Sequence, residues 1–309
     1  MSRRGATDLA GILAIDKPGG MTSHDVVEAV RRATGERRVG HAGTLDPAAT
    51  GLLVVLVGPA TRLEPYISSA QKAYEAEIAF GISTDTDDAE GETLQTLPVP
   101  DDVFTEARAR EILACFVGTS MQVPPAYAAI KVGGKKAYET ARKGGELELA
   151  PRPVVVHEAV LRHAHRRERT WDVLFVVSKG TYVRALARDI GTSARTAAHL
   201  SALRRMRSGT LDLDTHGHSL DDALAAAAEN RLPELFADPL DALGIPVVEA
   251  DPDLVRDGRP LPASAAGILD QGTLVAVAQD GRLLGVYRVT AEALVATTVI
   301  PGGVSGGSR

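Results

Sequence analysis

Strand-type and helix-type segments follow one another in this chain without regular alternation, and that order restricts its fold class. The apolar run Leu52–Val57 predicts a buried strand, and from Ala73 to Phe80 apolar residues alternate with charged ones, as in a half-buried strand. A helix is expected from Thr22, whose hydroxyl can form a capping box with Asp25. A parallel doubly wound sheet needs strands and helices in strict alternation. The sequence therefore predicts the α+β class.

Other local patterns complete this outline. Strands are expected at residues 13–15, 153–156 and 171–177. Helices are expected at residues 105–116, 181–191 and 197–206, and after Ser219, which can form a capping box with Asp222. Thr61 and Glu64 offer a further capping box. Two apolar runs around Asp280-Gly281 predict a hairpin with a type I′ turn.

Composition describes an ordinary globular chain. Its 309 residues favour two domains, and 44% hydrophobic with 24% charged residues fits a soluble protein. The longest apolar run is too short for a membrane span, and the N-terminus lacks the apolar region of a signal peptide. The single cysteine, Cys115, rules out an internal disulfide and a cysteine-based zinc cluster, and we expect a small buried thiol. A cytoplasmic location is expected.

The net charge of −6 is unevenly distributed along the chain. From Asp212 to the end there are 15 acidic and 6 basic residues, net −9, which leaves 28 basic and 25 acidic residues before it, net +3. Arginines are concentrated in two stretches of the sequence, residues 31–38 and residues 184–207. Because arginine binds phosphate through a planar fork, the two groups could form a track for a polyanion if the fold joined them. Separate solvated faces are the alternative.

The stretch GHAGTLDPAATGLL, residues 40–53, places one carboxylate, Asp46, among small residues and glycines. Neighbours this small leave a carboxylate open to a ligand and allow close approach of another molecule. The loop therefore indicates a functional site. The alternative is that Asp46 caps the turn or helix after it, a common use of aspartate before proline.

An ionised aspartate in such a pocket needs an opposite charge, because desolvation would otherwise neutralise it. Arg184 is the candidate, since it stands where a predicted strand gives way to a helix in SKGTYVRALARDIG. The alternative is an arginine on the surface of an ordinary helix.

The acidic run GISTDTDDAEGE, residues 81–92, does not predict a metal site. Its spacing departs from the EF-hand pattern, and a polar loop rich in Asx turns explains it better. The eight histidines show no zinc-binding spacing, and neither a P-loop nor a dinucleotide fingerprint is present.

With these residues noted, the sequence resembles the TruB family of bacterial tRNA pseudouridine(55) synthases. Six blocks carry the resemblance in the family's order: LAIDKPGGMTSHDVV, GHAGTLDPAATGLL, QKAYEA, PPAYAAIKVGGKKAYETAR, GTYVRALARDIG and HLSALRR. The resemblance implies a pseudouridine synthase fold with a mixed, largely antiparallel central sheet and a small C-terminal PUA-like domain. It implies a catalytic domain at residues 1–240 with a thumb-like insertion at about 124–145 and an RNA-binding domain at 245–301. The composition of the last residues, PGGVSGGSR, predicts a disordered tail at 302–309.

The resemblance also implies an activity and roles for individual residues. The family isomerises a uridine in the T-arm loop of tRNA to pseudouridine, with neither cofactor nor metal. From the sequence itself, we expect neither a membrane association nor an obligate protein partner. Asp46 would be the nucleophile, Arg184 its ion-pair partner, and Tyr74 would stack on the flipped uracil and assist proton transfer. The remaining implied contacts come from His41, Tyr182, Leu203 and Lys17, which would hold the RNA loop, line the uracil pocket and support the site.

Several alternatives remain open at this stage. Tyr74 and Leu203 fit an ordinary core, and Lys17 fits a solvated surface. The route taken by the aspartate is open: attack on the sugar, attack on the base, or assistance to deprotonation. For the whole protein, the alternatives are a tRNA folding chaperone whose catalysis is secondary and a magnesium-dependent phosphohydrolase that uses Asp46 and the acidic run.

Overall fold

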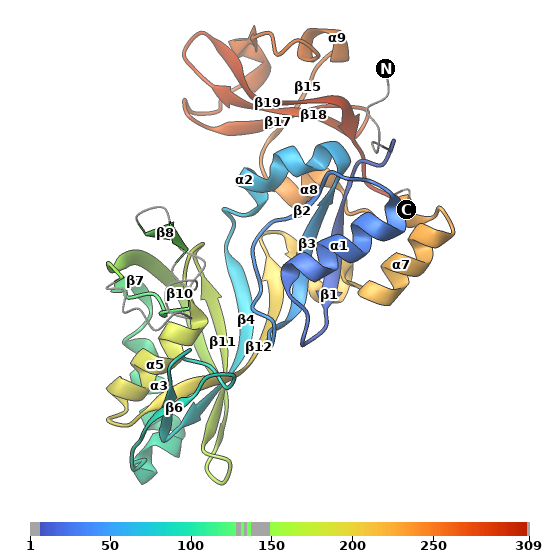
Figure 1. The fold of residues 1–309 in the computed structure, drawn as a ribbon. Coiled ribbons are helices and arrows are strands. Elements are labelled where there is room, and N and C mark those ends of the chain that lie inside the picture. Colours follow the sequence, from blue (N-terminus) through green and yellow to red (C-terminus); the bar gives the residue numbers. More distant parts are fainter. Residues whose placement is uncertain (1–6, 128–130, 133–134, 137–148, 308–309) are drawn as a thin grey trace. The chain divides into compact units, whose positions relative to one another are not determined.

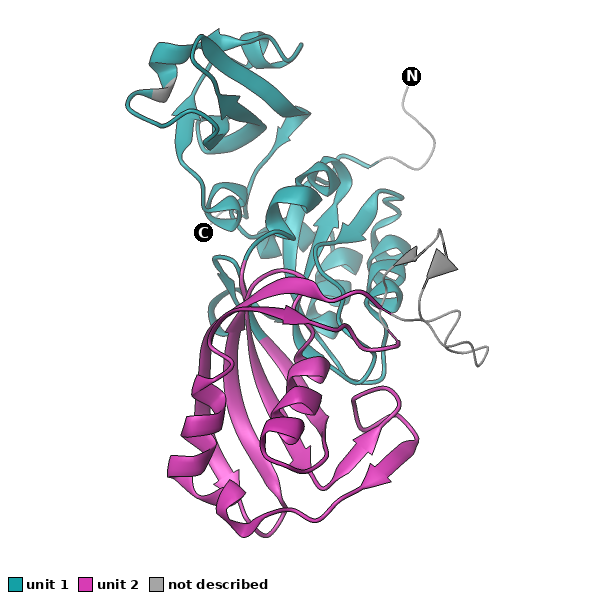
Figure 2. Cartoon of the chain, turned by 90° about the vertical axis from the view of Figure 1, so that its left-hand side faces the viewer, with its two compact units in different colours: residues 1–70, 206–309 teal, residues 71–205 magenta. Residues whose placement is uncertain are grey.

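The computed structural model describes residues 7–127, 131–132, 135–136 and 149–307 (Figure 1). The chain divides into two compact units (Figure 2). Unit 1 comprises residues 1–70 and 206–309, and unit 2 comprises residues 71–205. Among the described residues, no helix combines the length and the apolar character needed to cross a membrane.

Unit 1 contains strands grouped around β1 (Gly11–Lys17). β1 is antiparallel to β3 (Thr50–Val57) and parallel to β14 (His218–Ser219), and β2 (Val39–His41) pairs with β3. Helix α1 (Ser23–Thr34) packs against α7 (Leu220–Ala228) (Figure 1). The other short elements here are η1 (Gly58–Leu63), α2 (Glu64–Ile67), β13 (Leu211–Asp212), α6 (Leu213–His216), η3 (Leu232–Leu235) and α8 (Pro239–Leu243).

The capping residues explain where the helices of unit 1 begin. The Thr22 hydroxyl accepts from the Asp25 N–H, and the Asp25 carboxylate accepts from the Thr22 N–H, so the predicted capping box of α1 is confirmed. Ser219 caps α7 as predicted. Thr61 forms no such box, because it lies inside η1 and its hydroxyl donates to the Gly58 carbonyl.

The C-terminal part of unit 1 is a separate five-stranded sheet in the order β15-β17-β18-β19-β16. Asp280 and Gly281 both have positive φ, as the predicted type I′ hairpin between β17 and β18 requires. The residues of this sheet include their own core, with Val275, Val277 and Tyr287 fully buried. Its elements are β15 (Val247–Glu249), α9 (Pro252–Val255), β16 (Leu261–Pro262), η4 (Ala263–Ala266), β17 (Leu274–Gln279), β18 (Arg282–Val289) and β19 (Ala293–Val304).

The disordered tail predicted from residue 302 differs from the structure. β19 continues to Val304, which pairs with Leu283, and the Gly307 N–H donates to the Phe236 carbonyl. Gly302 and Gly303 both have positive φ, so glycines that suggest flexibility in the sequence instead form a bend within an ordered strand.

Unit 2 is built on a sheet in the order β12-β4-β11-β10-β7, in which the pairs β4-β11, β11-β10 and β10-β7 are antiparallel. Helices α3 (Glu106–Ala114) and α5 (Val183–Ser193) accompany it. The strands are β4 (Lys72–Phe80), β5 (Ile82–Thr84), β6 (Thr93–Thr96), β7 (Gly118–Gln122), β8 (Lys131–Val132), β9 (Lys135–Lys136), β10 (Arg152–His165), β11 (Thr170–Val177) and β12 (Ala198–Ser208), with η2 at Asp101–Phe104. Together the two units confirm the predicted α+β class. The thumb-like insertion predicted at 124–145 lies mostly outside the described residues.

Two local predictions for unit 2 are wrong. Residues 198–208 form strand β12 instead of a helix at 197–206. This segment is rich in good helix formers, but its pairing beside β4 overrides that local preference. Cys115 is exposed, because it follows the last turn of α3 and lies away from the buried stripe of Ala109, Ile112 and Leu113.

Candidate active site

The backbone next to Asp46 is held by a buried lysine. Lys17, at the end of β1, is fully buried, and its Nζ donates to the carbonyls of Pro18 at 2.8 Å, Met21 at 2.7 Å and Pro47 at 3.0 Å. The Gly20 N–H also donates to the Pro47 carbonyl, at 2.9 Å. The ammonium group therefore ties the turn after β1 to the Asp46 loop, and a solvated lysine is excluded.

A serine holds the other side of the same loop. The Ser23 hydroxyl, buried in the first turn of α1, donates to the Leu45 carbonyl at 3.0 Å and accepts from the Leu45 N–H at 2.8 Å. The residues before and after Asp46 are thus both fixed, while Asp46 itself is half-buried. An anchored backbone fixes the direction of the carboxylate more narrowly than a free loop would.

The loop around Asp46 runs from one strand into the next. His41 ends β2 and is half-buried, and the Ala42 N–H donates to the Val54 carbonyl of β3 at 2.9 Å. The Asp46 carbonyl accepts from the Ala49 N–H at 3.2 Å, after which β3 begins at Thr50. No helix follows Asp46 in this described stretch, so Asp46 does not cap a helix, while capping of the turn at residues 46–49 stays an alternative. His41, Asp46 and Lys17 are all brought to this part of unit 1.

In unit 2, Tyr74 lies in the middle of the sheet. It belongs to β4, pairs with Phe175 of β11 and is buried. The strand alternates as predicted, with Ala76, Ile78 and Phe80 buried on the same side. Lys72, two residues earlier, is also buried. Burial and, after it, the positive charges of Arg205 and Lys179 lower the pKa of Lys72 to about 8.

Arg184 is a buried residue in the first turn of α5, so the surface alternative is wrong. Its Nη1 lies 3.3 Å from Asp88 Oδ2 and donates to the Thr86 carbonyl at 2.9 Å. Its Nη2 donates to the Tyr127 carbonyl at 3.3 Å. These contacts orient the guanidinium within unit 2. Because Asp46 belongs to unit 1, the pairing of Asp46 with Arg184 stays a prediction.

The acidic run 81–92 pairs with arginines of α5. Asp87 Oδ2 accepts from Arg188 Nη1 at 2.8 Å, and Asp88 faces Arg184. Burial raises the pKa of Asp87, and the charges of Arg188 and Arg184 oppose that shift. Thr86 Oγ1 donates to Asp88 Oδ1, and the Glu92 N–H donates to Asp85 Oδ1, as in a polar turn-rich loop. In the described part of the chain no group of three or more metal-ligating side chains occurs.

Two more predicted site residues lie in unit 2. Tyr182 is half-buried and is the N-cap residue of α5, although it makes no side-chain capping bond. Leu203 is half-buried on β12, so it lies on a strand and not on the predicted helix. Tyr74, Tyr182, Arg184 and Leu203 therefore share unit 2.

Comparison with known proteins identifies the family. The family profile described as TruB family pseudouridylate synthase (N terminal domain) matches residues 31–183. A tRNA pseudouridine synthase B of Opitutus terrae is 45% identical over 248 residues, which cover 80% of this chain and 97% of that protein. The protein of the same name from Nocardia farcinica is 43% identical over 282 residues, covering 88% and 90%. The chain belongs to the TruB family.

Solved structures agree with this assignment at the level of the fold. A chain from a crystal structure of a Cbf5-Nop10-Gar1 complex matches with a TM-score of 0.72 at 24% identity, covering 94% of this chain and 85% of that one. A chain from an archaeal box H/ACA sRNP Nop10-Cbf5 complex matches with a TM-score of 0.70 at 23% identity, covering 94% and 86%. The TruB chain therefore has the fold of these proteins, in line with the predicted central sheet and C-terminal β domain.

Two contributors to the candidate TruB site were missed in the sequence. Asp88 was treated as part of an acidic loop and was not matched to Arg184. A buried arginine needs a carboxylate partner, and this argument, which links Arg184 to Asp46, applies equally to Asp88. Ser23 was not singled out, although it directly follows the predicted helix start at Thr22. A serine next to a helix N-cap gives no local signal for a contact 22 residues away.

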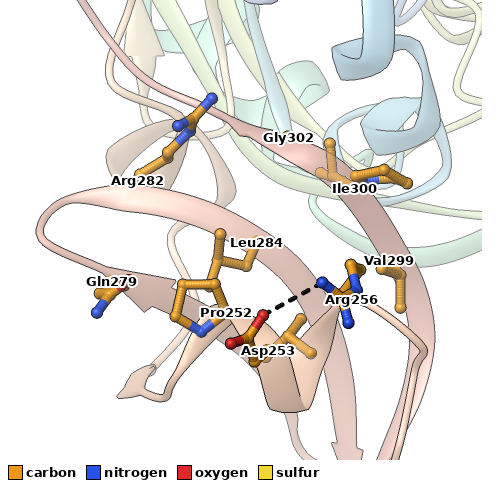
Figure 3. Close-up of a pocket in the computed structure, with 11 residues that line it drawn as sticks. Pro252, Asp253, Arg256, Gln279, Arg282, Leu284, Val299, Ile300 and Gly302 are labelled. Carbon is orange, nitrogen blue, oxygen red and sulfur yellow. Dashed lines mark hydrogen bonds and ion pairs between the residues drawn. The ribbon is translucent and has the colours of Figure 1, made fainter.

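The C-terminal sheet of the TruB chain has a pocket of about 260 Å³ outside the candidate site (Figure 3). Arg256 and Arg282 line it together with apolar residues such as Leu284 and Ile300. Arg256 already pairs with Asp253 at 3.3 Å, which offsets its charge. None of the predicted site residues lines this pocket.

Proposed function

We propose that this TruB family chain converts uridine 55, in the T-arm loop of tRNA, to pseudouridine, with Asp46 as the catalytic carboxylate. The relatives at 43–45% identity are tRNA pseudouridine synthases B. The observation that carries the proposal is the anchoring of Leu45 by Ser23 and of Pro47 by Lys17, which leaves the half-buried Asp46 between two fixed points. A carboxylate held in this way is preorganised for one reacting atom.

The reaction rearranges bonds within one nucleotide. The bond between N1 of uracil and C1′ of ribose breaks, the base turns, and a bond forms between C5 and C1′. The proton on C5 then leaves and N1 gains one, so atoms and electrons balance without a cofactor. Asp46 supplies the negative charge for the step at the sugar or base, and both routes, as well as deprotonation of the sugar, fit this scheme.

The target base must leave the folded loop before Asp46 can reach its sugar. Flipping costs a few kcal/mol of unstacking, and an aromatic face offsets part of that cost. In this proposal Tyr74 stacks on the uracil and its hydroxyl assists the late proton transfer. Tyr182 and Leu203 line the uracil pocket, and His41 holds the displaced RNA loop.

Arg184 is proposed to hold Asp46 ionised and oriented through an ion pair. Two observations support this role: the guanidinium is buried, and its contacts with Asp88 and with the Thr86 carbonyl fix its orientation. Lys17 is proposed to support the loop rather than to react.

The tRNA elbow is the proposed partner. It would be bound by the arginines at residues 31–38 and 184–207 and by the thumb-like insertion at 124–145. The sheet at residues 245–301 is proposed to be the PUA-like RNA-binding domain, and residues 1–240 the catalytic domain. Neither a metal ion nor a protein partner is part of the proposal. Because phosphate contacts release counterions, affinity for tRNA is expected to fall as salt rises.

Asp46→Asn tests the proposed nucleophile. Tritium placed on C5 of uridine is released when the carbon-linked product loses its C5 proton, so its release measures turnover. We expect turnover to fall at least about 10³-fold, as when an essential nucleophile is removed, with the Kd for tRNA changed by less than about threefold. The amide keeps the shape of the side chain and removes its charge.

Asp221→Asn is the matched control, because it removes one exposed carboxylate of unit 1 in α7. It should leave turnover unchanged. Wild-type turnover by Asp46→Asn would overturn the assignment of Asp46. Retained tRNA refolding by Asp46→Asn without turnover would show a chaperone activity that does not depend on catalysis.

A further inference from the structure

Gln122 makes two hydrogen bonds to the backbone of a single residue, Tyr182. Gln122 is the last residue of β7 and is buried, whereas the four residues before it in that strand are exposed. Its Oε1 accepts from the Tyr182 N–H at 2.9 Å, and its Nε2 donates to the Tyr182 carbonyl at 3.1 Å. One carboxamide thus satisfies both backbone groups of Tyr182, as a neighbouring strand would.

Tyr182 stands where extended backbone becomes helix. It is the N-cap residue of α5, with φ −99° and ψ 112°, and its carbonyl also accepts from the Leu186 N–H at 3.1 Å, the first bond of the helix. Its own side chain supplies no capping bond. Contacts that fix the Tyr182 backbone restrict where its ring can point, and Gln122 supplies two of these contacts.

The segment that follows Gln122 continues along the same helix. The Val123 carbonyl accepts from Arg188 Nη2 at 3.0 Å, and the Tyr127 carbonyl accepts from Arg184 Nη2 at 3.3 Å. Residues 122–127 are thus held at three points by α5 and its N-cap residue, all within unit 2. Among these contacts, the bonds of the Gln122 carboxamide are the ones made at the N-cap of the helix.

We propose that Gln122 is a positioning residue for the isomerisation: by clamping the Tyr182 backbone it aims the Tyr182 ring at the flipped uracil. The inference rests on the proposed role of Tyr182 in the uracil pocket. Gln122 acts through Tyr182 and does not touch the substrate. Loss of the clamp should therefore slow the chemical step more than it weakens tRNA binding.

The test compares Gln122→Ala with Val103→Ala by single-turnover kinetics. Val103 is buried in η2 of unit 2, so its truncation destabilises the same unit without removing a contact to Tyr182. For Gln122→Ala we expect the rate constant at saturating tRNA to fall by about 10-fold to 100-fold, with the Kd for tRNA changed by less than about threefold. Val103→Ala should keep the wild-type rate constant at a temperature where it is folded.

Gln122→Glu is the second variant in case Gln122→Ala does not fold. It keeps the side-chain shape and the bond from the Tyr182 N–H, but it places an oxygen against the Tyr182 carbonyl. A reduced rate constant in the folded variant supports the clamp. A wild-type rate constant in folded Gln122→Glu, or a loss in Gln122→Ala no greater than in Val103→Ala, overturns it.

A double-mutant cycle separates this inference from the proposed function. In a Tyr182→Ala background, Gln122→Ala should cost less than about threefold, because the ring that it positions is gone. An undiminished cost there overturns the action through Tyr182. Failure of the wild-type protein to form pseudouridine at all would instead count against the proposed function.

Discussion

Lys72 is a buried lysine of the unit 2 sheet, and its lowered pKa can be tested by measuring stability against pH. It precedes Tyr74 by two positions on β4, so the two side chains share the buried side of the strand. Burial, with help from Arg205 and Lys179, lowers its pKa from 10.5 to about 8. A lysine with a lowered pKa weakens the fold when protonated and ceases to do so once neutral.

The sign of the resulting pH dependence follows from the two pKa values of Lys72. Between pH 8 and pH 10.5 the unfolded chain holds the proton that the folded chain has lost, so the free energy of unfolding rises with pH. We expect Lys72→Met to remove a rise of up to about 3 kcal/mol across this window. Urea unfolding at pH 7.5, 9 and 10.5 measures it. An identical pH dependence in both proteins would show that Lys72 is not perturbed.

At the residue scale, sequence reasoning identified side chains better than it identified their partners. Asp46 and Arg184 were found because a charge among small or apolar residues is conspicuous. Asp88 and Gln122 were missed because their partners, Arg184 and Tyr182, are 96 and 60 positions away in the chain. Nothing local in MQVPP, residues 121–125, indicates that its glutamine meets a helix N-cap.

At the scale of the element, the start of α1 has two separable roles. Thr22 and Asp25 close the capping box and stabilise the helix. The adjacent Ser23 bonds to both backbone groups of Leu45 and so holds the Asp46 loop. Thr22 stabilises the helix, and Ser23 holds the Asp46 loop in place relative to that helix.

Thr22→Ala and Ser23→Ala separate these two roles. We expect Thr22→Ala to lower the free energy of unfolding by about 1 kcal/mol and to leave kcat within about twofold of wild type. Ser23→Ala leaves the Leu45 backbone groups unsatisfied, so it should cost about 1–3 kcal/mol and also lower kcat at least about 10-fold. Urea unfolding and tritium release give the two quantities. Equal kcat values for the two variants would contradict the anchoring role of Ser23.

Element predictions succeeded where a local signal and tertiary packing agree. The capping boxes of α1 and α7, the alternation of β4 and the Asp280-Gly281 turn are all encoded within a few residues. β12 was mistaken for a helix because Ala, Leu and Arg favour helices locally, whereas its neighbour β4 lies more than 100 residues earlier in the chain. Pairing with such a distant strand cannot be recognised from the hydrophobic pattern of a short stretch of sequence.

At the scale of the whole molecule, the order of elements was enough to predict the α+β class, and six ordered sequence blocks were enough to predict the TruB family. The boundaries of the compact units were not predictable in the same way. Unit 1 joins the first 70 residues to residues 206–309, so its strands come from both ends of the chain. The candidate residues are accordingly divided, with Lys17, His41 and Asp46 in unit 1 and Tyr74, Tyr182, Arg184 and Leu203 in unit 2.

The most direct test of the central claim is to map carbon-linked uridine in an unmodified tRNA transcript after incubation with the protein. Pseudouridine forms a carbodiimide adduct that survives alkali, and this adduct stops reverse transcription one nucleotide 3′ of the modified position. The account predicts a single new stop in the T-arm loop, which reports modification of position 55, at equal rates in magnesium-free buffer with excess chelator and in buffer with magnesium. A folded transcript that gains no such stop, or gains it only with magnesium, would contradict the account.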